Sequence, residues 1–168
     1  MAAGRAYGRE GRRALKGMIV LSVISVLPDI DVAGFSFGVP YEAPWGHRGA
    51  THSLTMALIL GCAAFLASRA LKLPPLKSAL FVTAVAASHG LLDTLTVGGG
   101  LGCELLWPFS PRRFWGPWRF IPVAPIGQDM FSARGAIVVA AELVLFAPFW
   151  IYATFPRRRR ASQDGSVH

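Results

Sequence analysis

The stretch SALFVTAVAASHGLLDTLTV, residues 78–97, is almost entirely apolar, yet it contains a histidine and an aspartate. Twenty such residues are about the length that an α-helix needs to cross a bilayer. His89 and Asp93 are four residues apart, so on a helix they share one face. Ionisable side chains inside a membrane segment are costly and usually functional. The stretch therefore predicts a transmembrane helix that carries part of a polar site. The alternative is a His–Asp pair that only stabilises helix packing.

The rest of the chain has the composition of a membrane protein. Of its 168 residues 53% are hydrophobic and only 15% are charged, and the mean hydropathy is +0.45. Further apolar segments lie at 17–27, 53–71 and 135–156. We expect an all-α integral membrane bundle of about four apolar segments with a long extramembrane loop rich in aromatic residues and arginine. Residues 1–156 would form this single domain, and 157–168 a basic, disordered tail.

The net charge of +8 is distributed in short basic blocks beside the apolar segments. This pattern is typical of membrane topology and argues against a nucleic-acid partner. If the helix ends alternate sides, one side receives twelve basic residues and the other five. The positive-inside rule then predicts a multi-pass inner-membrane protein with a cytoplasmic C-terminus. All the polar residues considered below would fall on the non-cytoplasmic half.

Two short motifs add possible metal ligands to His89 and Asp93. LPDIDV, residues 27–32, contains Asp29 and Asp31, which point to one face if the chain is extended; a turn or helix-end pair is the alternative. HRGATH, residues 47–52, places His47 and His52 around a flexible glycine; an ordinary surface pair is the alternative. Thr51 or Ser53 could cap the helix that begins near Leu54.

Three imidazoles and three carboxylates are a ligand set for zinc, with manganese or iron as alternatives. The predicted metal ligands are Asp29, Asp31, His47, His52, His89 and Asp93. Six ligands favour a two-metal cluster with an activated water, so we expect one or two divalent ions per chain. The two cysteines, Cys62 and Cys103, form no metal motif and are not expected to pair.

The loop from Glu104 to Gly127 alternates aromatic residues, proline and arginine. The aromatic residues are typical of an interfacial belt, and its arginines of lipid headgroup anchors. Arg112, Arg113 or Arg119 could instead bind a substrate phosphate. Glu104 and Glu142 are additional candidate site residues; Glu142 could be a ligand, a base or a helix-packing residue. Asp129 is expected to begin a loop or helix.

Five motifs together resemble the YdjM-like family of membrane-bound metal-dependent hydrolases: LPDIDV, PWGHRGATHSL, ASHGLLDTLT, LLWPFSPRRF and IPVAPIG. The resemblance covers roughly residues 15–150. That family is similar to the zinc phospholipase C and nuclease group, in which a His-x-x-x-Asp pair on a helix binds metal. The resemblance thus implies a metal-binding role for His89 and Asp93. It also implies that an N-terminal helix with a Thr-His pair is missing here, because no histidine precedes His47.

The leading interpretation is a membrane-bound hydrolase that cleaves a phosphoester, which could be a membrane phospholipid, through a metal-activated water. Asp31 and His52 would act in catalysis, and Arg48 or Arg112 would neutralise the phosphate. A second interpretation is a metal or proton transporter, or a metal sensor, that uses the same ligands without hydrolysis. A third is a structural membrane protein whose polar residues only pack helices.

Overall fold

The computed structural model describes residues 1–8 and 11–155. The chain is mostly helical, with a short α1 (Ala2–Gly8) and three long rods, α2 (Gly11–Val26), α3 (Leu54–Ala70) and α4 (Pro75–Asp93). The 3-10 helix η1 (Leu27–Phe37) continues α2, and η2 (Ala50–His52) precedes α3. The loop region contains β1 (Thr96–Val97), β2 (Ile121–Pro122) and η3 (Gly127–Phe131), before α5 (Ala133–Leu145) and α6 (Ala147–Thr154).

Several of these helices are long and apolar enough to cross a membrane. The continuous rod Ala14–Phe37 has 24 residues and α4 has 19; the bent pair α5 and α6 makes a third span if counted as one. The shorter α3 is an apolar helix of 17 residues, which rises about 26 Å. Large apolar side chains on the outer surfaces are exposed, such as Leu66 and Ile137, each 67% exposed. This surface suits lipid contact, so the expected all-α membrane fold is confirmed.

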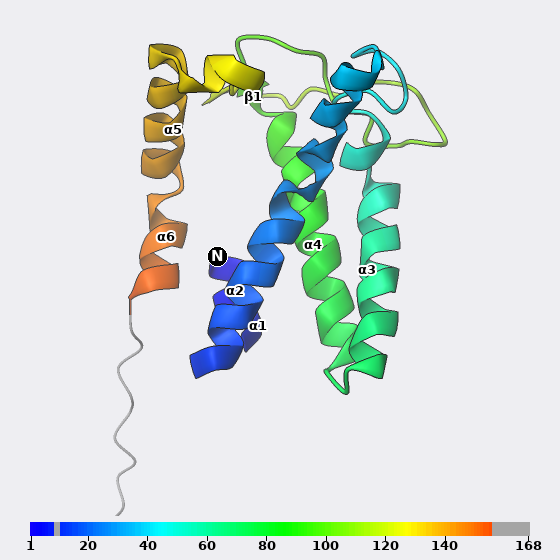
Figure 1. Cartoon of the computed structure of the whole chain (residues 1–168), viewed down its shortest axis with the longest axis vertical. Coiled ribbons are helices and arrows are strands. Elements are labelled where there is room, and N and C mark those ends of the chain that lie inside the picture. The colour runs from blue at the N-terminus through cyan, green and yellow to red at the C-terminus, as the bar shows by residue number, and fades with distance from the viewer. Residues whose placement is uncertain (9–10, 156–168) are drawn as a thin grey trace, which may run out of the picture.

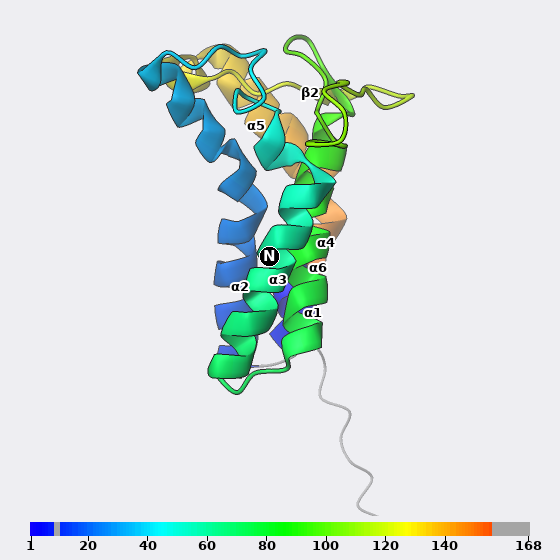
Figure 2. The same cartoon turned by 90° about the vertical axis from the view of Figure 1, so that its right-hand side faces the viewer.

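The rods alternate in direction and gather the loops at one end (Figure 1). α2 and η1 run toward the end that carries β1 and η3, α3 runs away from it, α4 returns, and α5 and α6 descend again. The turn between α3 and α4 lies at the opposite end (Figures 1 and 2), and α6 runs toward that end without reaching the level of the turn (Figure 1). The alternation assumed in counting basic residues is therefore present in the bundle. The predicted tail at 157–168 lies outside the described residues.

The first apolar segment differs from its expected form. α2 ends directly before LPDIDV, but this motif is not extended; it lies within η1, which continues the rod to Phe37. Pro28 occupies the first turn of η1, where the missing N–H of proline costs nothing and its fixed φ favours helical geometry. In a tight helix, residues two apart do not share a face. Of the two alternatives, the extended pair is therefore wrong, and Asp29 and Asp31 lie in the helical segment that follows the end of α2.

The other helix ends follow from local chemistry. Ser53, one of the two predicted caps, is the N-cap of α3. Its hydroxyl accepts a hydrogen bond from the Met56 N–H at 3.0 Å. α4 begins at Pro75, three residues before the predicted start, and ends at Asp93 rather than 97. The predicted fourth segment is broken by 65° between α5 and α6, and Pro148 lies in the first turn of α6.

The segment after α4 forms a small platform over the loop end of the bundle. β1 and β2 pair in parallel, with Thr96 opposite Ile121. Cys103 and Phe114 exchange two backbone hydrogen bonds, and the N–H of Glu104 donates to the carbonyl of Arg48 at 2.9 Å. These contacts hold the long loop against the segment that contains His47 and His52. Cys62 and Cys103 are both free, as expected.

Candidate metal centre

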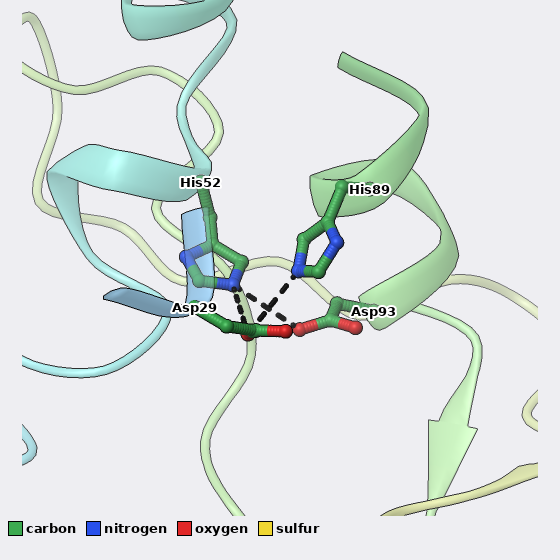
Figure 3. Close-up of side chains that lie close together, drawn as sticks. All are labelled: Asp29, His52, His89 and Asp93. Atoms are coloured by element: carbon green, nitrogen blue, oxygen red, sulfur yellow. Dashed lines mark hydrogen bonds and ion pairs between the residues drawn. The ribbon is translucent and has the colours of Figure 1, made fainter. Parts of the chain in front are cut away.

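Four of the predicted ligands meet at the loop end of the bundle. Figure 3 shows Asp29 from η1, His52 from η2, and His89 and Asp93 from the last two turns of α4, with their side chains directed toward one another. One ligand atom from each lies within 4.8 Å of the others. The Nε2 atom of His89 is 3.2 Å from Oδ1 of Asp29. Segments that are far apart in the sequence thus converge on a space of the size that a metal ion requires.

Gly90 sets the distance between η2 and α4. A Cβ atom at this position would lie 2.3 Å from the carbonyl oxygen of His52, far inside van der Waals contact. Only glycine therefore permits η2 to pack this closely against the helix that carries His89 and Asp93. Gly90, which directly follows His89 in SHGLLD, therefore helps to set the geometry of the site.

The two ring nitrogens of His52 have different surroundings. Its side chain is fully buried, and Nδ1 lies 3.1 Å from Oδ2 of Asp31. The opposite atom, Nε2, faces Asp29 at 3.4 Å and Asp93 at 3.5 Å, and it has no hydrogen-bond partner among the described residues. A buried nitrogen that makes no hydrogen bond is costly, and the two carboxylates at ion-pair distance offset only part of that cost. A metal-binding histidine typically has this arrangement, with one nitrogen held by a carboxylate and the other free for the ion.

Asp31 lies at the centre of a second group with His47 and His52. Its Oδ1 atom accepts from Nδ1 of His47 at 2.7 Å. Its Oδ2 atom accepts from the Thr51 hydroxyl at 2.5 Å and the Arg48 N–H at 3.3 Å, besides the contact with His52. Both oxygens are therefore engaged by donors of the chain itself. This is the environment of a carboxylate that positions ligands.

Arg48 is buried and makes several contacts at the site. Its Nε atom forms an ion pair with Oδ2 of Asp93 at 3.1 Å, although their orientation is not that of a hydrogen bond. One terminal nitrogen donates to the Thr96 hydroxyl at 3.0 Å and to the Leu101 carbonyl at 3.3 Å. The backbone of Arg48 has φ of 64°, in the left-handed region that arginine rarely adopts. Arg48 thus fixes the carboxylate of Asp93 relative to the platform.

The loop residues chosen from the sequence lie away from the four-residue group. Arg112 is exposed and stacks over Phe114, with its guanidinium carbon 5.4 Å from the ring centre. Glu104 is buried and pairs with Arg113 at 3.0 Å. Arg113 also donates to the carbonyls of Tyr41, His47 and Gly102. These hydrogen bonds connect the loop to the segment that contains His47. The sequence did not indicate this structural role of Arg113.

A large cavity opens beside the four-residue group. Its volume is about 1140 Å³, and Asp29, His89 and Asp93 form part of its wall together with Arg48 and His47. Glu142 of α5 and Asp129 of η3 also line it, whereas Arg112 and Glu104 do not. Glu142 therefore shares a space with the ligands, although it is not part of the four-residue group.

Burial and the surrounding charges shift the pKa values of His52 and Cys103 in the loops around the site. Burial alone would lower the pKa of His52, but the carboxylates of Asp29, Asp31 and Asp93 outweigh it and raise the pKa to about 10. In the metal-free protein a proton therefore occupies this imidazole. Burial raises the pKa of the Cys103 thiol to about 12, so this cysteine is a neutral thiol.

Comparison with known proteins assigns the chain to a family. The family model described as YdjM inner membrane protein matches residues 1–160. The inner membrane protein YbcI of Escherichia coli strain K12 is 40% identical over 124 residues, which are 73% of this chain and 71% of that protein. No solved structure matches the chain. With its apolar helices, its loop platform and this match over nearly the whole length, the chain belongs to the YdjM inner membrane protein family.

Proposed function

We propose that this protein is a membrane-bound, metal-dependent hydrolase that cleaves a phosphoester. The observation that carries the proposal is the buried Nε2 atom of His52, which lacks a hydrogen-bond partner within the described residues and faces two carboxylates. His89 completes the group, in which one ligand atom from each of the four residues lies within 4.8 Å of the others. Three of the four line the cavity directly, so a small molecule can reach them.

In this proposal one divalent ion is held by Asp29, His52, His89 and Asp93. Two imidazoles and two carboxylates suit zinc, with manganese or iron as alternatives. Asp31 is assigned as a positioning residue that orients His47 and His52, because both its oxygens already accept hydrogen bonds. The second group of Asp31, His47 and His52 then needs no ion of its own.

When bound, such an ion lowers the pKa of a coordinated water and polarises a phosphoryl oxygen. The residues of the chain provide the geometry for this chemistry. Asp31 holds the imidazole of His52 with Nε2 toward Asp29 and Asp93, and Arg48 holds the carboxylate of Asp93. Glu142 lines the same cavity from α5 and is assigned as the proton acceptor for the attacking water. Arg112 has no part, since it does not line the cavity.

Transport is a weaker interpretation of the same ligands. An ion pathway needs polar groups spread along the depth of the bundle. Below the ligand group, the described parts of α2, α3 and α4 contain no further aspartate, glutamate or histidine. The ligands gather at one end (Figures 1 and 3), which supports a site for chemistry. The basic residues orient this end toward the non-cytoplasmic face in our proposal.

The test is hydrolysis of bis(p-nitrophenyl) phosphate and p-nitrophenyl phosphate by protein purified in detergent and loaded with zinc. We expect release of p-nitrophenol that a chelator abolishes, that added zinc restores, and that His89→Ala lacks. The matched control is Asp129→Asn, which changes a carboxylate of the cavity outside the ligand group. Metal-loaded protein that hydrolyses neither a diester nor a monoester would contradict the proposal.

A further inference from the structure

The cavity joins two different environments. At the loop end its wall contains the charged groups of Asp29, His89, Asp93 and Arg48. Elsewhere its wall contains apolar side chains, among them Val26 at the end of α2 and Phe146 at the junction of α5 and α6. A small soluble phosphoester would contact only the first part. The cavity as a whole has the polarity pattern of an amphiphile.

The apolar part lies between helices that face the membrane. Figure 1 shows α5 set apart from α2 and α4, and the cavity has walls from all three helices. Val26 is 61% exposed although it belongs to an apolar rod of membrane-spanning length. Because Val26 lines the cavity from this apolar rod, its exposed surface faces a space between helices of membrane-spanning type. A molecule can therefore reach the cavity sideways, from within the membrane.

Arg134 supplies a cation to the polar part of the cavity. It lies in the first turn of α5, lines the cavity, and donates to the carbonyl of Gly98 at 3.2 Å. This is its one hydrogen bond to the residues that the structure describes, so its other guanidinium N–H groups remain free for a ligand. Arg48, by contrast, is occupied by Asp93, Thr96 and Leu101.

The three glycines after β1 expose main-chain groups to the same cavity that Arg134 lines. Gly98, Gly99 and Gly100 all line the cavity, and their φ values are 102°, 152° and 75°. A side chain at any of them would be strained in this conformation. The run therefore presents bare backbone beside Arg134, and a bulky headgroup can approach both closely.

We propose that the cavity binds a phospholipid with an anionic headgroup, which rests on the proposed function because the scissile phosphate must reach the four metal ligands. The phosphate lies between these ligands and Arg134, which forms charge-assisted hydrogen bonds with it. The acyl chains leave between α2 and α5, over Val26 and Phe146. Arg134 is thus a substrate-binding residue that the sequence motifs did not indicate.

The test measures lipid binding to the full chain by native mass spectrometry. The metal content of the same samples is determined in parallel. Dioleoyl phosphatidic acid is the lipid probe, and glycerol 3-phosphate is its headgroup alone. We expect one saturable phosphatidic acid per chain, bound at least about tenfold more tightly than glycerol 3-phosphate because methylenes are buried. Arg134→Gln weakens the lipid complex about tenfold or more, and Arg134→Lys retains most of the affinity.

Two further variants locate the lipid. Arg119→Gln is the control, since Arg119 stacks on Trp115 and does not line the cavity; we expect it to leave binding unchanged. Val26→Trp fills the apolar part, and because Val26 is exposed the larger side chain does not disturb a packed core. It should weaken phosphatidic acid and leave glycerol 3-phosphate unaffected. Thermal unfolding of each variant verifies that it is folded.

Three results would overturn the inference. Equal affinity for glycerol 3-phosphate and phosphatidic acid would identify a soluble phosphoester as the source of the phosphate. Unchanged lipid binding in Arg134→Gln would remove the role of Arg134, and no saturable lipid binding would remove the site. A protein that binds lipid through Arg134 but holds no metal would contradict the proposed function and leave this inference standing.

Discussion

The carboxylate of Asp31 lies 3.1 Å from Nδ1 of His52 and thereby turns the opposite ring nitrogen toward Asp29 and Asp93. Asp31 connects several residues of the site, because it also accepts hydrogen bonds from His47, Thr51 and the backbone N–H of Arg48. A residue of this kind orients a ligand without itself needing to touch the ion.

This relationship predicts the effect of Asp31→Asn. An asparagine keeps the shape but weakens the charge-assisted contacts, so zinc affinity should fall by about ten- to a hundredfold while the stoichiometry stays at one. Zinc titration with a competing chelator measures both quantities. A stoichiometry of two in the wild type that drops to one in Asp31→Asn would instead establish a binuclear centre with Asp31 as a ligand.

The raised pKa of His52 predicts a pH dependence of the metal-free protein. Its folded pKa of about 10 exceeds the ordinary 6.5, so the folded state binds the proton more tightly than the unfolded state does. The stabilisation is fully present below pH 6.5 and is lost as the pH rises to about 10. Thermal unfolding with a chelator present should show this loss in the wild type and not in His52→Gln.

Metal binding should have the opposite pH dependence. A proton on His52 competes with the ion, so zinc affinity should increase as the pH rises toward 10. Zinc titrations at several pH values measure this trend. An affinity that is constant over this range would show that His52 does not exchange a proton for the metal.

Arg48 offers a test that separates its charge from its backbone conformation. Arg48→Ala leaves Asp93 without its ion pair and should lower the free energy of unfolding by about 3 kcal/mol. Arg48→Gly loses the same contact but relieves the φ of 64°, so it should be less destabilising by about 1 kcal/mol. Denaturant titration of both variants compares them. Equal stabilities of alanine and glycine would argue against backbone strain at this position.

Gly90→Ala tests the close approach of η2 to α4. The added methyl group would lie 2.3 Å from the carbonyl oxygen of His52, so the two segments must separate. We expect loss of zinc binding with α4 still formed, since alanine favours a helix. Zinc titration and circular dichroism together measure this. Unchanged zinc affinity would show that His52 can shift without loss of the site.

The sequence predicted the parts of the site that depend on local spacing. The i, i+4 relation places His89 and Asp93 on one face of α4, and Ser53 caps α3. It did not predict η1, because Pro28 can either stop a helix or begin a 3-10 turn. It also did not predict the 65° bend near Pro148.

Residues that matter through distant contacts were harder to identify from sequence. Arg113 clamps segments that are more than sixty residues apart, and Thr51 acts on Asp31 through a hydrogen bond formed only in the fold. Arg134 has no motif around it and reaches the cavity because α5 stands opposite α4. Spacing along the chain carries no signal for such contacts.

The measurement that most directly tests the central claim is the metal content of the purified protein by mass spectrometry after incubation with zinc and dialysis. We predict one equivalent in the wild type, one in the control Asp129→Asn, and none in Asp93→Asn, because Asp93 belongs to the four-residue group and Asp129 does not. A wild-type protein that retains no metal, or an Asp93→Asn protein that retains a full equivalent, would contradict the account.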